Sequence, residues 1–167
     1  MPARLSTRHH LSSPEDTAAL ARALAPQLQP GDTLLLDGPI GAGKTHFARA
    51  LIQARLAAAG RFEDVPSPTF TIVQTYDDGF AEIWHADLYR LTDPQETHEL
   101  GLSEAFDHAI CLVEWPDRLG VSAPSGALRL TFAPGKEDNQ RVLTFEGDAP
   151  RWDDLLAALA IPTKEAL

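Results

Sequence analysis

A glycine-rich segment that ends in a lysine and a threonine carries the clearest chemistry in this sequence. Residues 38–45, Gly-Pro-Ile-Gly-Ala-Gly-Lys-Thr, match the pattern G-x-x-x-x-G-K-S/T of phosphate-binding loops. Glycines at both ends permit backbone conformations that a Cβ would forbid, so backbone amides can converge on a phosphate. The residues of this motif that are predicted to hold a nucleotide are Gly38, Gly41, Ala42, Gly43, Lys44 and Thr45.

The last two residues of the motif suit a nucleotide that carries Mg²⁺. Lys44 can neutralise the β- and γ-phosphates as a point charge. The helix expected to begin here adds the equivalent of about +0.5 elementary charge at its N-terminus. The Thr45 hydroxyl is placed to bind Mg²⁺. Since no guanine-recognising Asn-Lys-x-Asp sequence is present, the pattern favours ATP and ADP as ligands.

Two carboxylates that follow apolar strands are candidates to complete the site. Glu114 comes directly after the apolar run 110–113, where Mg-nucleotide enzymes commonly carry a carboxylate. We therefore predict that Glu114 and Thr45 are the magnesium ligands. Asp87 follows the expected strand at 83–85 and could hold a magnesium-bound water or orient the attacking one. The alternative for Asp87 is a helix-capping role. The predicted catalytic residues are Lys44, Asp87 and Glu114.

A proline-containing loop lies between the helix that follows the motif and the next strand. Its residues are Ser67, Pro68, Thr69 and Phe70. In nucleotide switches such a segment can become ordered on the γ-phosphate and relax after hydrolysis, and Thr69 could sense that phosphate. The alternative is an ordinary loop that its prolines stiffen. Trp115 could pack on the nucleotide or on a partner, or it could belong to the core.

The elements expected around these residues alternate between strands and helices. Helices are predicted from Pro14 to about residue 28, over 45–59, from about residue 94, and over 152–159. Strands are predicted over 33–36, 70–76, 80–85, 110–113, 128–132 and 142–145. This order predicts one α/β domain over residues 1–167, a P-loop NTPase whose two hairpins make the sheet mixed parallel and antiparallel, flanked by helices. Residues 1–10 are expected to be flexible, and residues 127–167 to form a hairpin plus a helix.

The composition limits the partners that this chain can bind directly. Lys and Arg number 14 against 24 Asp and Glu, a net charge of −10, and no dense basic run exists. Direct nucleic-acid binding normally requires a basic surface, so any action on RNA should go through a partner. A single cysteine, Cys111, excludes an internal disulfide and is expected to be a buried strand thiol. With no apolar signal core and no long apolar run, a cytoplasmic protein without membrane association is expected.

Four segments together resemble the TsaE family, the ATPases of bacterial tRNA threonylcarbamoyladenosine biosynthesis. They are 41–45 (Gly-Ala-Gly-Lys-Thr), 67–71 (Ser-Pro-Thr-Phe-Thr), 85–91 (His-x-Asp-Leu-Tyr-Arg-Leu) and 113–116 (Val-Glu-Trp-Pro), in the family's order. Two departures are present. Pro39-Ile40 stands where Asp-Leu is common, and His46 stands where a threonine is common.

The resemblance implies a compact P-loop fold and Mg²⁺-dependent ATP hydrolysis that drives or resets a complex of TsaD and TsaB. That complex modifies the adenosine beside the tRNA anticodon, so tRNA is reached only indirectly. The resemblance also implies that Asp87 is needed for hydrolysis, that residues 67–70 are the switch-like loop, and that His46 and Trp115 lie near the nucleotide. Two other functions stay open: a small-metabolite kinase, and a non-catalytic adaptor that only binds nucleotide.

Overall fold

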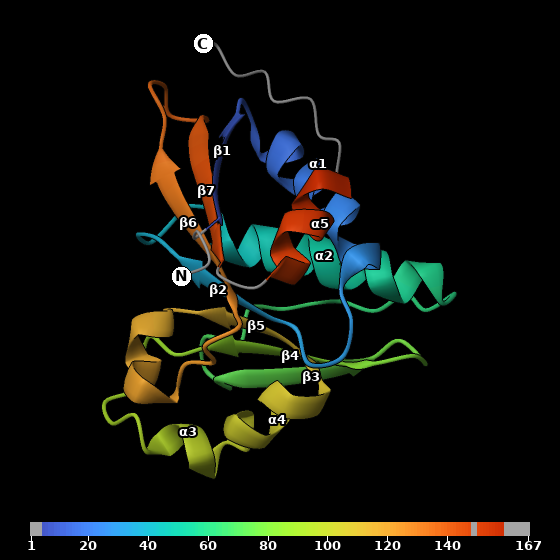
Figure 1. The fold of residues 1–167 in the computed structure, drawn as a ribbon, viewed down its shortest axis with the longest axis vertical. Coiled ribbons are helices and arrows are strands. Elements are labelled where there is room, and N and C mark those ends of the chain that lie inside the picture. Colours follow the sequence, from blue (N-terminus) through green and yellow to red (C-terminus); the bar gives the residue numbers. More distant parts are fainter. Residues whose placement is uncertain (1–4, 148–149, 159–167) are drawn as a thin grey trace.

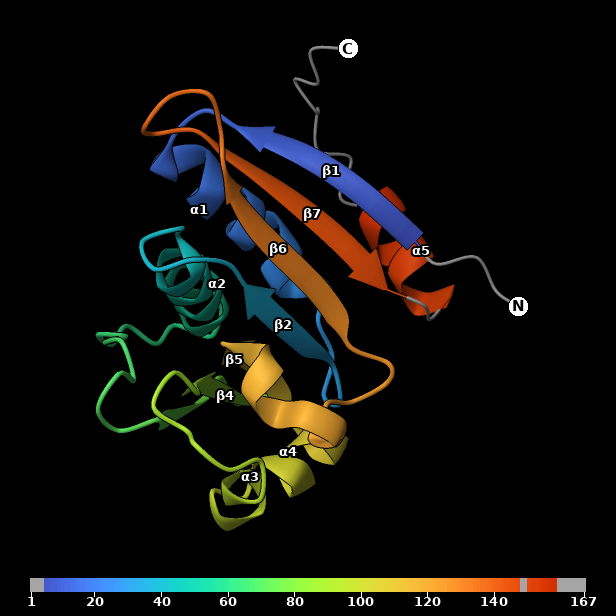
Figure 2. The same ribbon diagram turned by 90° about the vertical axis from the view of Figure 1, so that its left-hand side faces the viewer.

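The fold is known from a computed structural model, which describes residues 5–147 and 150–158. One sheet holds its strands in the order β1-β7-β6-β2-β5-β4-β3 (Figures 1 and 2). Neighbours among β6, β2, β5 and β4 are parallel, whereas β1–β7, β7–β6 and β4–β3 are antiparallel. The predicted mixed sheet is therefore confirmed. The strands are β1 (Leu5–Leu11), β2 (Thr33–Asp37), β3 (Val73–Asp77), β4 (Glu82–Asp87), β5 (Ile110–Glu114), β6 (Leu128–Pro134) and β7 (Arg141–Gly147).

Helices cover both faces of this sheet, which confirms the predicted α/β layers. In Figure 1, α1, α2 and α5 lie on one side of the sheet, and α3 and α4 lie near its other face. Each face has its own apolar cluster; one includes Leu24, Leu51 and Trp152, and the other includes Leu102 and Leu119. The helical elements are α1 (Pro14–Leu24), η1 (Ala25–Gln27), α2 (Lys44–Ala58), α3 (Glu96–Glu99), α4 (Leu102–His108), η2 (Pro116–Ser122) and α5 (Pro150–Ala158).

The central strands bring their carboxyl ends to one edge of the sheet. Strands β2 and β5 read Thr-Leu-Leu-Leu-Asp and Ile-Cys-Leu-Val-Glu and are buried along almost their whole length, as parallel strands covered on both faces must be. Leu36 pairs with Glu114, and Asp87 at the end of β4 pairs with Glu114 from the other side. Cys111 is a buried strand thiol, as expected, and burial raises its pKa to about 12.

The first helix begins where the sequence predicts. The Ser13 hydroxyl accepts the amide of Asp16 at 3.3 Å, and Pro14 occupies the first turn. Leu20 and Leu24 lie one helical turn apart and are both buried toward α2. This packing places α1 against the helix that leaves the phosphate-binding motif.

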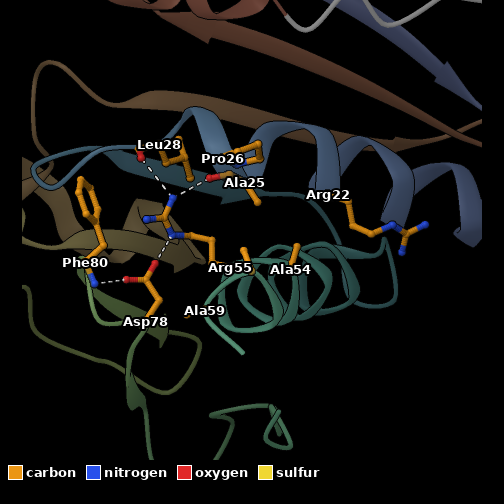
Figure 3. A pocket seen from close by; sticks show the side chains of 10 residues that line it. Arg22, Ala25, Pro26, Leu28, Ala54, Arg55, Ala59, Asp78 and Phe80 are labelled. Atoms are coloured by element: carbon orange, nitrogen blue, oxygen red, sulfur yellow. Dashed lines mark hydrogen bonds and ion pairs between the residues drawn. The ribbon is translucent and has the colours of Figure 1, made fainter. Parts of the chain in front are cut away.

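A buried arginine ties α2 to two neighbouring segments (Figure 3). Arg55 donates from Nε to Asp78 Oδ2 at 2.8 Å and from Nη1 to the Ala25 and Leu28 carbonyls at 2.7 and 3.2 Å. The other oxygen of Asp78 accepts the backbone amides of Phe80 and Ala81 at 2.8 and 2.7 Å. These contacts join α2, η1 and the β3–β4 turn at the end of α2 away from the phosphate-binding motif.

The N-terminal segment corrects one expectation. Residues 1–10 were expected to be flexible, but residues 5–11 form β1, which pairs with β7 from Leu5↔Gly147 to Leu11↔Arg141. The physical reason is a period of two, in which Thr7, His9 and Leu11 face inward between exposed residues. The His9 ring packs edge-on against Phe145, with 5.1 Å between centroids. Residues 1–4 lie outside the described residues.

The C-terminal hairpin and helix are present as predicted. Strands β6 and β7 pair antiparallel, and α5 returns against the sheet. The indole of Trp152 is fully buried and donates to the Gly126 carbonyl at 2.8 Å, and Arg151 Nε donates to Asp32 at 2.8 Å. The predicted end of this helix, residue 159, lies outside the described residues. Over residues 5–147 and 150–158, no helix combines the length and apolar character needed to cross a bilayer.

Candidate active site

The glycine-rich segment forms a tight loop between β2 and α2. Gly38, Gly41 and Gly43 have φ values of +148°, +79° and +106°, which residues with a Cβ rarely adopt. At Gly38 a Cβ would lie 2.7 Å from the carbonyl oxygen of Phe132 on β6, so the loop begins in direct contact with the neighbouring strand. The loop closes on itself, because the Ala42 amide donates to the Pro39 carbonyl at 3.2 Å.

The lysine of the motif turns back into the loop. Lys44 is buried, and its Nζ donates to the Gly38 carbonyl and lies 3.5 Å from the Pro39 carbonyl. The amine also lies over the Trp115 ring, 3.5 Å from its centroid, as a cation–π contact. Burial lowers the pKa of Lys44, although Glu114, Asp37 and Asp87 oppose that shift. The amine thus lies inside the loop, where the phosphates of a loop-bound nucleotide would be.

The two predicted magnesium ligands lie in direct contact. The Thr45 hydroxyl lies 2.8 Å from Glu114 Oε1 and 3.0 Å from Oε2. On the other side, His85 Nε2 lies 2.6 Å from Glu114 Oε2, and both of these side chains are buried. A hydroxyl at the start of α2 and a carboxylate at the end of β5 thus form one polar cluster.

Hydroxyl and carboxylate oxygens are the ligands that Mg²⁺ prefers, so this pair fits the predicted ion. Mg²⁺ usually takes one or two protein carboxylates and completes its shell with water and nucleotide phosphates. In the part of the chain that the structure describes, no three His, Cys, Asp or Glu side chains form a group that could hold a metal. By the chemistry of their oxygens, Thr45 and Glu114 are the residues that would hold Mg²⁺ together with a nucleotide.

Asp87 is the last residue of β4 and shares a cavity of about 450 Å³ with the phosphate-binding loop. Its Oδ1 accepts the backbone amide of Tyr89 at 3.0 Å, a contact within a turn; since the next helix begins only at Glu96, the alternative helix-capping role is wrong. Burial raises the pKa of Asp87, the Tyr89 amide opposes this, Glu114 adds to it, and His85 and Lys44 reduce it. The remaining oxygen, Oδ2, has no hydrogen-bond partner within the described residues.

The raised pKa gives a stability prediction for Asp87→Asn. A carboxyl whose pKa is higher in the folded state than in the unfolded state destabilises the fold when it is ionised. This loss of stability is fully present at pH values above the folded-state pKa. It disappears as the pH falls below the unfolded-state pKa of about 3.9. We expect Asp87→Asn to raise the melting temperature at pH 7, by a few degrees at most in a chain of this size. In thermal scans, the rise in melting temperature of Asp87→Asn should become smaller toward pH 4. The control Asp64→Asn, at an exposed position, should show no such rise. A rise of the same size at every pH would contradict the prediction.

The switch-like loop contributes two hydroxyls to the same cavity. Ser67 and Thr69 line it, and their hydroxyl oxygens lie 2.6 Å apart. The Pro68 carbonyl accepts the Ile72 amide at 2.7 Å, which makes a turn where the sequence predicts strand. Phe70 is 83% exposed and faces the Arg90 guanidinium, 5.6 Å from its ring centroid. Thr69 thus lies in the same cavity as the phosphate-binding loop, and the Phe70 side chain faces solvent.

Two aromatic rings form another wall of the cavity. Trp115 has a φ of +59°, and its ring lies 4.9 Å from that of Tyr89. His46 also lines the cavity, while its Nε2 lies 2.9 Å from the Pro14 carbonyl at the start of α1. The residues that line the cavity are Ile40, Gly41, Ala42, Gly43, Lys44, Thr45, His46, Ser67, Thr69, Asp87, Tyr89, Glu114 and Trp115.

Sequence reasoning missed two side chains at this site. His85 stands in the segment 85–91, but the sequence predicts no role of its own for it. A signal for one is present, because residues two apart on a strand share a face, and Asp87 follows His85 by two. Arg141, on β7, donates to the carbonyls of Gly41 and Ala42 at 3.1 Å each. No local pattern connects it to a loop so far away in sequence.

Comparison with known proteins finds a matching family and several relatives. The family model described as threonylcarbamoyl adenosine biosynthesis protein TsaE matches residues 11–143. The tRNA threonylcarbamoyladenosine biosynthesis protein TsaE of Bacillus subtilis is 36% identical over 149 residues, covering 89% of this chain and 90% of that protein. The protein of the same name from Rickettsia conorii is 44% identical over 109 residues, covering 65% of this chain and 61% of that protein.

A solved structure agrees with these matches. The crystal structure of Bacillus subtilis YdiB superposes with a TM-score of 0.75 at 32% sequence identity and covers 96% of each chain. The resemblance that the four sequence segments suggest is therefore confirmed, and this chain belongs to the TsaE family.

Proposed function

We propose that this chain is a Mg²⁺-dependent ATPase that drives or resets a TsaD–TsaB complex during threonylcarbamoyladenosine modification of tRNA. The observation that carries the proposal is the contact between the Thr45 hydroxyl and the Glu114 carboxylate, 2.8 Å apart beside a phosphate-binding loop. Phosphoryl transfer depends mainly on positioning and electrostatic stabilisation, and these residues supply both. The names of the relatives support a role in tRNA threonylcarbamoyladenosine biosynthesis.

The chain's own residues would bind and orient the triphosphate. Backbone amides of the loop and the Lys44 amine would meet the phosphates, and Thr45 and Glu114 would hold the magnesium ion. The ion, when bound, neutralises charge that develops on the β- and γ-phosphate oxygens. Trp115 keeps water from one side of the Lys44 amine, because its ring lies directly against Nζ.

Asp87 is the candidate to orient the attacking water. It lines the same cavity, and its Oδ2 accepts no hydrogen bond from the described residues. Its raised pKa makes it a better proton acceptor than an ordinary aspartate. Water attack on the γ-phosphorus releases ADP and phosphate, and the water proton passes to the carboxylate or to the product phosphate.

The coupling to partners would run through the loop at residues 67–70. Thr69 lies at the cavity and Phe70 is exposed, so a change at the γ-phosphate can alter a surface that another protein contacts. The net charge of −10 favours protein partners over direct contact with tRNA. TsaD and TsaB are the proposed partners, and tRNA is reached through them.

The test is ATP turnover of the purified chain with and without TsaD and TsaB. We expect slow Mg²⁺-dependent hydrolysis alone and faster hydrolysis with both partners, because P-loop switches often need a partner to complete the site. Lys44→Ala, in which the phosphate-facing charge is removed, should abolish both rates. Equal turnover with and without partners would refute the coupling.

Two further outcomes would refute the proposed activity itself. Transfer of the γ-phosphate to a small acceptor rather than to water would identify a kinase. Nucleotide binding without single-turnover hydrolysis, alone or with partners, would identify an adaptor. Both outcomes can be read from one experiment with γ-labelled ATP, followed by separation of phosphate from phosphorylated products.

A further inference from the structure

The β6–β7 hairpin lies against the outer side of the phosphate-binding loop. Arg141, the first residue of β7, donates from Nε to the Ala42 carbonyl and from Nη2 to the Gly41 carbonyl, at 3.1 Å each. Its Nη1 donates to the carbonyls of Asp138 and Gln140 at 2.7 and 2.8 Å. All three guanidinium nitrogens therefore bind backbone oxygens, two in the loop and two in the hairpin turn.

These contacts fix the orientation of two peptide groups. A trans peptide is planar, so its C=O and N–H point in opposite directions. When Arg141 holds the Gly41 and Ala42 oxygens outward, the amides of Ala42 and Gly43 must point to the opposite side. The Ala42 amide bonds to the Pro39 carbonyl, whereas the Gly43 amide has no acceptor within the described residues.

The loop separates two cavities, and Arg141 belongs to the outer one. The outer cavity, about 250 Å³, is lined by residues 39–42 and by the hairpin residues 134–138 and Arg141. The inner cavity contains Lys44, Thr45 and Glu114. An amide turned away from Arg141 therefore faces the side on which the phosphates would bind.

We propose that Arg141 is a positioning residue that presets the amides of the phosphate-binding loop for a polyphosphate. The inference rests on the proposed function, since it concerns the nucleotide that this loop takes. It also gives the C-terminal hairpin a role in nucleotide binding. Two strands support the loop from behind: Phe132 on β6 contacts Gly38 at its start, and Arg141 on β7 holds its end.

Calorimetric titration with Mg-ADP and Mg-ATP tests this role through three variants. Arg141→Met removes all donors, and Arg141→Lys keeps the charge but loses the planar fork that reaches two carbonyls at once. We expect both to weaken nucleotide binding about 10- to 100-fold, the scale of one or more charge-assisted hydrogen bonds. Lys136→Met removes the same charge from the exposed turn of the same hairpin and should bind as the wild type does.

Steady-state kinetics separate positioning from a general loss of fold. The amides hold phosphates in the ground state and in the transition state alike, so KM should rise while kcat changes by less than about threefold. Near-wild-type affinity of Arg141→Lys would show that charge alone matters, and near-wild-type affinity of Arg141→Met would refute any role. If Arg141→Met fails to fold, Arg141→Gln, which keeps one donor, serves in its place. Absence of nucleotide binding by the wild type would overturn the proposed function itself.

Discussion

Glu114→Ala should reduce the rate of ATP hydrolysis by about 10²-fold or more, the loss seen when one electrostatic stabiliser of a transition state is removed. The carboxylate is buried between the Thr45 hydroxyl at 2.8 Å and the His85 imidazole at 2.6 Å. Its removal takes away the carboxylate oxygens that would bind Mg²⁺ and leaves the buried His85 imidazole and the half-buried Thr45 hydroxyl without this partner. Phosphate release under saturating Mg-ATP measures this loss.

Controls separate this chemical effect from a loss of stability. Glu114→Gln keeps the side chain's shape and one acceptor oxygen but removes the charge, so its turnover should also fall strongly while its melting temperature changes less. Glu104→Ala removes a glutamate from the exposed face of α4 and should leave turnover unchanged. Near-normal hydrolysis by Glu114→Ala would refute its assignment as a magnesium ligand.

Gly38→Ala should strongly destabilise the folded chain. An added Cβ would meet the Phe132 carbonyl oxygen at 2.7 Å and the Phe132 Cβ at 3.0 Å, at a backbone φ of +148°. Overpacking and a strained backbone each cost about 1–3 kcal/mol, so we expect a loss of about 2–6 kcal/mol. Denaturant unfolding would measure it, and ADP binding should weaken as well because the loop would move off β6.

Substitutions at two other glycines separate the cost of the strained backbone from the cost of the contact with Phe132. Gly41 has a φ of +79° but open space around a Cβ, so Gly41→Ala should lose only the cost of the strained backbone. Gly126 has neither a positive φ nor a neighbour within 4 Å, and Gly126→Ala should be nearly neutral. Equal stability losses at Gly38 and Gly41 would show that the contact with Phe132 does not contribute.

The central part of the fold could be predicted because its signals are local. The apolar runs of β2 and β5, the Ser13-Pro14 cap and the hairpin around residues 135–140 each specify their element through neighbouring residues. Strand β1 was missed because its inward-facing positions include Thr7 and His9, which lack an apolar signature. Its place in the sheet depends on β7, which no local pattern shows.

The residues of the candidate active site also divide into those with a local sequence signal and those that depend on distant contacts. The loop glycines, Lys44 and Thr45 are linked by spacing, and Glu114 by its place after an apolar strand, so sequence alone could place them together. Helix α4 was not predicted, although Leu102 and Ala105 from it fill the second apolar cluster. His85 and Arg141 act through contacts with residues 29 and about 100 positions away, which only the folded chain brings together.

The pairing of the first strand with the last one has a consequence for synthesis on the ribosome. Leu5 can pair with Gly147 only after residue 147 has left the ribosome. In the same way, Phe132 and Arg141 contact a phosphate-binding loop that leaves the ribosome well before they do. Contacts between such distant segments form late and slow the folding of a chain. A nascent polypeptide whose β6–β7 hairpin is still inside the ribosome should therefore be unable to bind a nucleotide.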